Sequence, residues 1–425
     1  MNVGLVVIVL LLVLSFLGIP IYIALGIGTL VAMNLSGIAT IVLPQKLFAG
    51  MNSTSLLAIP FFILAGSLMA KGITGKLIAI VNAVIGRVKG SLGVVTVLAS
   101  TLFGAISGSG VATVSAIGGI TIPAMEDNDY PPPFAAALAS VSSVLGPVIP
   151  PSIPLIVYAS CCTTVSVASL FIGSLVPGLI LALAMVVYCL VYGKRHDLPA
   201  HEKISGRQIA RTFRDGIWAL FMPIIILGGI FGGIFTPTEA AAVSVAYTLF
   251  VGFFIYKDLN AKDCFHIFFD ASISTATVMM LVGLSKASSY VVVTSGLPQQ
   301  MLKLFTSITS SKIVILLLLN ILFLILGMLM EANAAIIMMT PILLPLLDAF
   351  GIDPLSFGII MSFNLCIGLV TPPVGLSLLV GNQIAGTSLS KTVRALLPML
   401  FISIVVLMLV TYIPAITQWL PSLLH

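Results

Sequence analysis

Charged residues are scarce in this chain. Asp, Glu, Lys and Arg make up only 7% of the 425 residues, whereas soluble proteins carry about 25%. The mean hydropathy is +1.23, and apolar runs of 18 or more residues recur along the whole length. The alternating ten-residue strands of an outer-membrane barrel are not recognisable. The composition excludes a soluble domain and predicts an all-α polytopic membrane protein.

Catalytic and metal-binding patterns are also missing. The five cysteines lie in or beside apolar segments without metal-ligand spacing, and the four histidines fall in predicted loops or at the chain end. Ser107 and Ser109 therefore have no base with which to act as nucleophiles. Residues 72–77 (Gly-Ile-Thr-Gly-Lys-Leu) fail as a phosphate-binding loop because the first glycine is misplaced and no Ser or Thr follows the lysine. We expect neither an enzyme nor an ATP-driven pump.

Proline interrupts one apolar run in a distinctive way. Residues 368–375 (Gly-Leu-Val-Thr-Pro-Pro-Val-Gly) lie inside a run from about 357 to 384. Two adjacent prolines remove two amide donors and push the preceding residue out of helical geometry. In lipid, the freed carbonyls are tolerated only where protein or a hydrated cavity meets them. Such broken helices form ion and substrate sites in secondary transporters.

The same break occurs earlier, at residues 146–152 (Gly-Pro-Val-Ile-Pro-Pro-Ser). Shifting the numbering by 222 superimposes the two breaks, and the same shift places Pro123 on Pro345 and Pro132 on Pro354. A shift of 221 places Pro177 on Pro398. Prolines in near-constant register indicate two structural repeats, which we expect to have inverted topology, each with a re-entrant hairpin and a broken helix.

The repeats suggest a division of the chain. Residues 1–193 form the first repeat, with scaffold helices, an arm helix near 72–89, a hairpin and a broken helix. Residues 194–215 form a hydrophilic, basic loop that the positive-inside rule places in the cytoplasm. Residues 216–425 form the second repeat and a final span. We expect eleven to fourteen membrane segments, with residues 3–34 as two short spans or one kinked span.

Few polar residues lie within the apolar regions. Glu331 and Asn333 begin the second predicted hairpin, and Ser107 and Ser109 occupy the corresponding place in the first. Their oxygens suit a hard cation such as Na⁺, and helix amino termini at the breaks would attract an anionic substrate. For the Ser/Gly run, close helix packing is an alternative explanation.

Two other charges lie in apolar surroundings. Glu239 follows Thr236 and Pro237 in a helix-start pattern, which favours a capping role over an ion ligand. Lys286 is expected to reach the membrane interface or to pair with a carboxylate.

These motifs resemble those of a known family. Residues 106–109 (Ile-Ser-Gly-Ser) running to Pro123, 149–152 (Ile-Pro-Pro-Ser), 236–241 (Thr-Pro-Thr-Glu-Ala-Ala) and 371–375 (Thr-Pro-Pro-Val-Gly) are similar to signatures of the large membrane subunit of tripartite ATP-independent periplasmic (TRAP) transporters. The resemblance covers essentially the whole chain. It implies an elevator-type, Na⁺-coupled importer of an organic acid in a bacterial inner membrane. It also implies a small membrane subunit of about four spans and a soluble periplasmic binding protein, neither of which we expect to be fused here.

The resemblance also implies site residues. Sodium contacts are expected at the hairpin tips and breaks, with Asn333 added from its position: Ser107, Ser109, Gly146, Pro150, Gly327, Asn333, Gly368, Thr371 and Val374. Substrate contacts are expected at Ser107, Ser109, Ser152 and Glu331. Many family members carry Asp where this chain has Glu331. Sialic acid and C4-dicarboxylates are the family's candidate substrates, and the 107–125 stretch favours sialic acid.

Alternatives remain open from the sequence. A stand-alone anion transporter or antiporter would share the broken helices, and a structural subunit of a membrane complex would share the composition. The scarcity of protonatable groups at the breaks favours Na⁺ over H⁺ as the coupling ion, but Glu331 keeps H⁺ as a second possibility.

Overall fold

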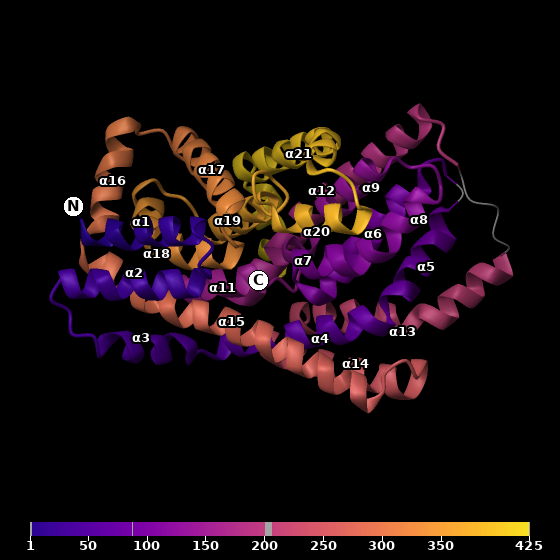
Figure 1. The fold of residues 1–425 in the computed structure, drawn as a ribbon, viewed down its shortest axis with the longest axis horizontal. Helices are drawn as coiled ribbons and strands as arrows, with labels where there is room; N and C mark the ends of the chain where they lie inside the picture. Colours follow the sequence, from indigo (N-terminus) through magenta and orange to yellow (C-terminus); the bar gives the residue numbers. More distant parts are fainter. Residues whose placement is uncertain (1, 87, 200–205, 425) are drawn as a thin grey trace.

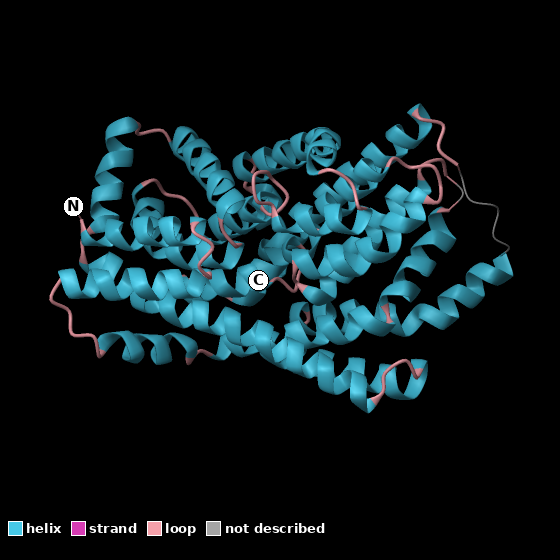
Figure 2. Cartoon of the chain, in the orientation of Figure 1, coloured by secondary structure: helices cyan, strands magenta, loops and turns pink. Residues whose placement is uncertain are grey.

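The computed structural model describes residues 2–86, 88–199 and 206–424, and within these ranges the chain is helical, with no strand (Figures 1 and 2). Eight helices of the described residues are long and apolar enough to cross a membrane, or nine if the bent pair 132–148 and 153–161 counts as one span. Seven shorter apolar helices accompany them. The predicted all-α membrane fold is confirmed.

The chain begins with a helical hairpin, α1 (Val3–Phe16) and α2 (Ile21–Leu35). At 1.5 Å per residue, each helix is about 21–23 Å long, which is short of the ~30 Å hydrocarbon core. The start of α1 and the end of α2 lie together, because Asn2 and Ser36 line one pocket. The Asn2 amide also donates to the Ser295 carbonyl, at the end of α15, at 3.0 Å. One kinked span was therefore the wrong alternative for residues 3–34, which form two short antiparallel helices.

The first repeat runs to the basic end of a long helix. Its elements are α3 (Val42–Met51), the 3₁₀ turn η1 (Thr54–Leu57), α4 (Ala58–Gly72), α5 (Thr74–Ile85), α6 (Ser91–Ser107), α7 (Gly110–Thr113), the π-helical turn η2 (Val114–Gly118), α8 (Gly119–Glu126), α9 (Pro132–Ser142), α10 (Leu145–Val148), α11 (Ile153–Cys161) and α12 (Val167–Arg195). The predicted arm helix is α5, which buries one face against α6 and α13.

The second half contains α13 (Gly206–Phe231), α14 (Pro237–Phe250), the π-helical turn η3 (Val251–Tyr256), α15 (Ala261–Thr294), α16 (Leu297–Ile308), α17 (Lys312–Leu329), α18 (Ala332–Ala349), α19 (Pro354–Gly368), α20 (Leu376–Ala385), α21 (Leu389–Tyr412) and α22 (Ala415–Leu424). Helix α13 begins before the predicted end of the hydrophilic loop, so Arg207, Arg211 and Arg214 are helical. Residues 200–205 of that loop lie outside the described residues. The repeat boundaries at 193 and 216 stay a prediction.

The two repeats follow one another element by element. Helices α9 and α19 begin at Pro132 and Pro354, and α12 and α21 begin at Val167 and Leu389, so both pairs obey the numbering shift of 222. In Figure 1, α3 and α4 run from left to right and α15 runs from right to left. The hairpin α6–α8 opens to the right and the hairpin α17–α18 opens to the left, so their tips meet near the centre. The repeats are therefore inverted.

Candidate functional site

The first hairpin tip is a tight turn held by hydroxyl groups. Helix α6 ends at Ser107, Gly108 has a φ of 60°, and Ser109 caps α7 by accepting a hydrogen bond from the Ala112 amide at 3.4 Å. Thr113 donates to the Ser109 carbonyl at 2.7 Å, and its Oγ1 lies 3.3 Å from Ser107 Oγ. A Cβ at Gly108 would lie 2.7 Å from the Pro151 carbonyl oxygen, so the tip lies directly on the first break.

The first break separates α10 from α11. Ile149 is extended, and Pro150 and Pro151 are joined by a cis peptide bond. Ser152 is fully buried; its hydroxyl accepts from the Leu155 amide at 3.3 Å, which caps α11, and donates to the Pro147 carbonyl. Ser152 thereby satisfies one carbonyl that the break frees.

The second hairpin tip has the same design with a carboxylate in place of the hydroxyl. Glu331 corresponds to Ser109 under the same numbering shift, and it caps α18 by accepting from the Ala334 amide at 3.2 Å. Its other oxygen accepts from the Asn333 amide group at 2.6 Å. The Asn333 side-chain oxygen is buried and has no hydrogen-bond partner among the described residues.

The second break follows α19. Thr371 donates to the Ile367 carbonyl at 2.8 Å, which leaves the lone pairs of its hydroxyl unused by that bond. Pro372 and Pro373 are again joined by a cis bond, and Gly375 has a φ of 47° before α20 begins. Val374 is 38% exposed.

Glycines let each hairpin lie against its break. A Cβ on Gly104 would be 2.8 Å from Gly146 Cα, and a Cβ on Gly327 would be 3.0 Å from Gly368 Cα. Both values are well below ordinary carbon contacts of about 3.5–4.0 Å. The predicted residues Gly146, Gly327 and Gly368 are thus needed for close backbone packing, a role that their sequence pattern did not predict.

Both tips and both breaks meet at a small central cavity of about 60 Å³. Ser109, Pro147, Glu331, Asn333 and Leu369 contribute to its lining. A neighbouring cavity of about 190 Å³ is also lined by Glu331. Two other predicted residues, Gly327 and Val374, line it as well. The rest of its lining includes three residues at the α1–α2 turn: Ser15, Gly18 and Ile19.

The predicted residues thus divide into two groups. Ser109, Asn333, Glu331, Gly327 and Val374 line the two cavities. The others line neither and lie in the tips and breaks behind them: Ser107, Gly146, Pro150, Ser152, Gly368 and Thr371. Their assignment to sodium or substrate stays a prediction. Thr113 was missed, although its position four residues after Ser109 on a helix was the available signal.

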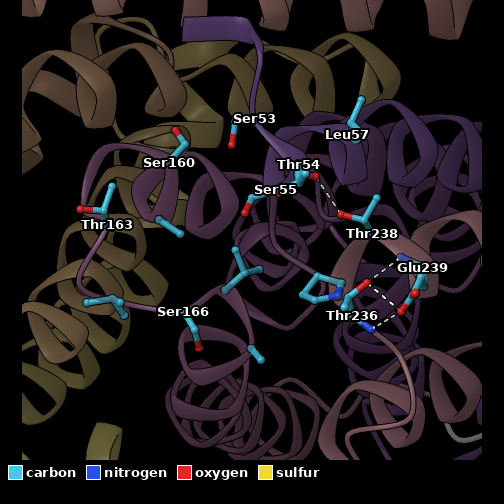
Figure 3. A pocket seen from close by; sticks show the side chains of 15 residues that line it. Ser53, Thr54, Ser55, Leu57, Ser160, Thr163, Ser166, Thr236, Thr238 and Glu239 are labelled. Carbon is cyan, nitrogen blue, oxygen red and sulfur yellow. Dashed lines mark hydrogen bonds between the residues drawn. The ribbon is translucent and has the colours of Figure 1, made fainter. Parts of the chain in front are cut away.

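A larger cavity, of about 730 Å³, lies elsewhere (Figure 3). Its hydroxyl-rich lining comes from the segment around Ser53–Ser55, the end of α11 with the loop that follows it, and the start of α14. There, Thr236 and Glu239 form the expected capping box: the Thr236 hydroxyl accepts from the Glu239 amide and Glu239 accepts from the Thr236 amide at 2.8 Å. The predicted capping role of Glu239 is confirmed.

Lys286 does not form the carboxylate pair that was one of its two predicted alternatives, and its reach to the membrane interface stays a prediction. Its Nζ donates to the Ser160 carbonyl at 2.6 Å, at the end of α11, and within the described residues no carboxylate forms an ion pair with it. A backbone carbonyl at a helix end takes the place of the expected carboxylate because the last carbonyls of a helix have no partner in the helix itself.

Inverted repeats with two hairpins and two broken helices that meet in the centre define a class of membrane transporters. The fold is similar to that of the YdaH transporter of Alcanivorax borkumensis, with a TM-score of 0.60, 16% identity and coverage of 89% of this chain and 88% of that one. At this identity the likeness shows the fold alone.

Residues 8–416 match the family described as the DctM component of tripartite ATP-independent periplasmic transporters, and the chain belongs to this family of TRAP large permease subunits. It is 42% identical to the YgiK protein of Salmonella typhimurium over 96% of this chain and 94% of that protein. It is 41% identical to the C4-dicarboxylate TRAP transporter large permease protein DctM of Pseudomonas aeruginosa, covering 92% and 94%. It is 36% identical to the sialic acid TRAP transporter large permease protein SiaM of Vibrio cholerae, covering 96% of each.

Proposed function

We propose that this TRAP large permease carries an organic acid across a bacterial inner membrane together with Na⁺. The observation that supports this most strongly is the convergence of two hairpin tips and two helix breaks on one cavity that contains carboxylate, amide and hydroxyl oxygens. A transporter that binds an ion and a solute needs free backbone groups, side-chain oxygens and helix ends in one place.

The residues at the central cavity fit a hard cation. Na⁺ prefers oxygen ligands, and Ser109, Glu331 and Asn333 supply a hydroxyl, a carboxylate and an amide oxygen. Leaving the Asn333 oxygen buried and unpaired costs about 1–3 kcal/mol. A bound cation would remove this cost, and it would balance the Glu331 charge.

The neighbouring cavity of about 190 Å³ suits the substrate. An organic acid there would bring its carboxylate close to Glu331, and two like charges repel each other strongly in a poorly hydrated site. A Na⁺ beside Glu331 would offset this repulsion. Substrate affinity would then depend on Na⁺, which is the coupling that a symporter requires.

We propose that transport moves one part of the fold against another. In our proposal the core, α6–α12 with α17–α22, slides against a scaffold of α1–α5 with α13–α16. A small membrane subunit of about four spans extends the scaffold, and a periplasmic binding protein delivers the acid. The positive-inside rule would place the basic end of α12 and the basic start of α13 on the cytoplasmic side.

Uptake into proteoliposomes tests this function. The chain is reconstituted with its small partner, the binding protein is added outside, and a C4-dicarboxylate or sialic acid is supplied without ATP. We expect uptake only with an inward Na⁺ gradient and the binding protein. Uptake with Na⁺ but without the binding protein would contradict the delivery step, and uptake driven equally by a proton gradient alone would contradict Na⁺ coupling and implicate Glu331 protonation.

A further inference from the structure

The helix pairs α1–α2 and α13–α14 turn in the same way. Two residues after each first helix ends, a glycine has positive φ, 82° at Gly18 and 66° at Gly233. The amide of the isoleucine that follows the glycine closes the turn with a hydrogen bond. Ile19 donates to the Leu14 carbonyl at 3.1 Å, and Ile234 donates to the Gly229 carbonyl at 2.9 Å. A proline lies at the start of the second helix in both pairs: Pro20 directly precedes α2, and Pro237 is the first residue of α14. The pairs are therefore equivalent scaffold elements.

These equivalent turns face non-equivalent parts of the core. The α1–α2 turn lies across the 190 Å³ cavity from Val374 in the second break. Val374, Gly375 and Leu376, which line that cavity, correspond to positions 152–154 under the numbering shift of 222. The start of α14, residues 236–239, lies across the 730 Å³ cavity from Ala159 and Ser160, which are five to eight positions further along. At 1.5 Å per residue the offset is about 8–12 Å. The core is seated asymmetrically between two equivalent turns.

Lys286 links the scaffold to the core at this place, because it lies on α15 and bonds to α11. It is the one charged residue between positions 271 and 294 of α15, and its ammonium donates to the Ser160 carbonyl at the carboxyl end of α11. A cation there satisfies an orphan carbonyl and the negative end of the helix dipole. Its stem packs on Gly50, where a Cβ would lie 2.6 Å from Lys286 Cγ. The equivalent position in the first repeat is Leu64, which cannot donate.

We propose that Lys286 is a positioning residue for transport: it holds α11, and the first break with it, in the position relative to the scaffold that is observed here. We call this position the observed seat, and the position that the core reaches after sliding along the scaffold the second seat. In the second seat the Lys286–Ser160 bond is broken, and the start of α11 faces the start of α14 at Thr238. The 730 Å³ cavity, whose lining includes the end of α11 and the start of α14, leaves room for this exchange. The inference rests on the proposed movement of core against scaffold, but not on the identity of ion or substrate.

Two cysteine pairs in a background without the native cysteines report the seats. Ile19→Cys with Val374→Cys reports the observed seat, and Ile153→Cys with Thr238→Cys reports the second. Losing a charge-assisted hydrogen bond should shift the ratio of the two cross-links about tenfold. We therefore expect Lys286→Met to raise the second cross-link and lower the first, whereas Lys286→Arg keeps the original ratio. Lys46→Met is the matched control, because Lys46 lies over the Tyr290 ring at 4.6 Å and both residues belong to the scaffold.

Three results would overturn the proposal: Lys286→Met leaves both cross-links unchanged, it lowers both together as mere loosening would, or the second pair never cross-links in any variant. The cross-linking needs neither Na⁺ nor substrate. Uptake is measured on the chain with its native residues. A reciprocal shift of the cross-links, together with no Na⁺-driven uptake by that chain, would therefore uphold the role of Lys286 and reject the proposed symport, and uptake with unchanged cross-links would do the reverse.

Discussion

Close glycine packing between each hairpin and its break gives a prediction that the structure makes quantitative. In Gly327→Ala, the new Cβ would lie 2.9 Å from the Leu365 carbonyl oxygen and 3.0 Å from Gly368 Cα. Ordinary contacts are about 3.5–4.0 Å, so α17 and α19 would have to separate by about 0.5–1 Å. Both obstacles are backbone atoms, which cannot rotate away. Gly104→Ala meets Gly146 Cα at 2.8 Å in the first repeat and should behave in the same way.

Overpacking of this kind costs about 1–3 kcal/mol. We expect both variants to lower the thermal unfolding midpoint of the purified protein and to reduce solute uptake, because the tip moves away from the break. Gly228→Ala is the matched control: it lies within α13, and a Cβ there meets nothing within 4 Å. Alanine at such a position is expected to be neutral or stabilising. Wild-type midpoints and uptake in Gly104→Ala and Gly327→Ala would refute the packing argument.

Two further predictions concern single side chains. Thr371→Val removes a hydroxyl oxygen from the second break, and we expect the Na⁺ concentration for half-maximal uptake to rise about tenfold; unchanged Na⁺ dependence would remove Thr371 from the site. Burial of the Asp353 carboxyl opposes its ionisation, but hydrogen bonds from Ser356 and Gln418 outweigh this and hold its pKa below its usual range. Its contribution to stability is therefore present above about pH 4 and is lost as the pH falls through the lowered pKa. Asp353→Asn should flatten the acid limb of the midpoint-versus-pH curve, and an unaltered acid limb would contradict this.

Most of the architecture was predictable from the spacing of the prolines along the sequence. Prolines restrict the backbone locally, so their spacing reports where helices begin and break whatever the tertiary contacts are. The two breaks, the two hairpins and the start of α14 at Pro237 were predictable for this reason.

Other features depend on contacts that no local pattern encodes. Lys286 finds a carbonyl on a helix from the other half of the chain, and the roles of Gly104 and Gly327 depend on helices that pack from distant parts of the sequence. The start of α13 was missed because its basic residues suggested a loop. Their spacing of three and four positions at 207, 211 and 214 is also helical, and Arg211 lies 3.9 Å from Asp215 one turn further on.

Binding of radioactive ²²Na⁺ to the purified protein tests the central cavity most directly. Ser109→Ala, Glu331→Gln and Asn333→Ala each remove an oxygen or a charge from that cavity, and Ser403→Ala removes a buried hydroxyl that donates to the Met399 carbonyl elsewhere. A cation held between the two hairpin tips predicts weaker Na⁺ binding in the first three variants and wild-type binding in Ser403→Ala. Equal Na⁺ affinity in all four variants and the wild type would contradict a sodium site at the meeting point of the tips.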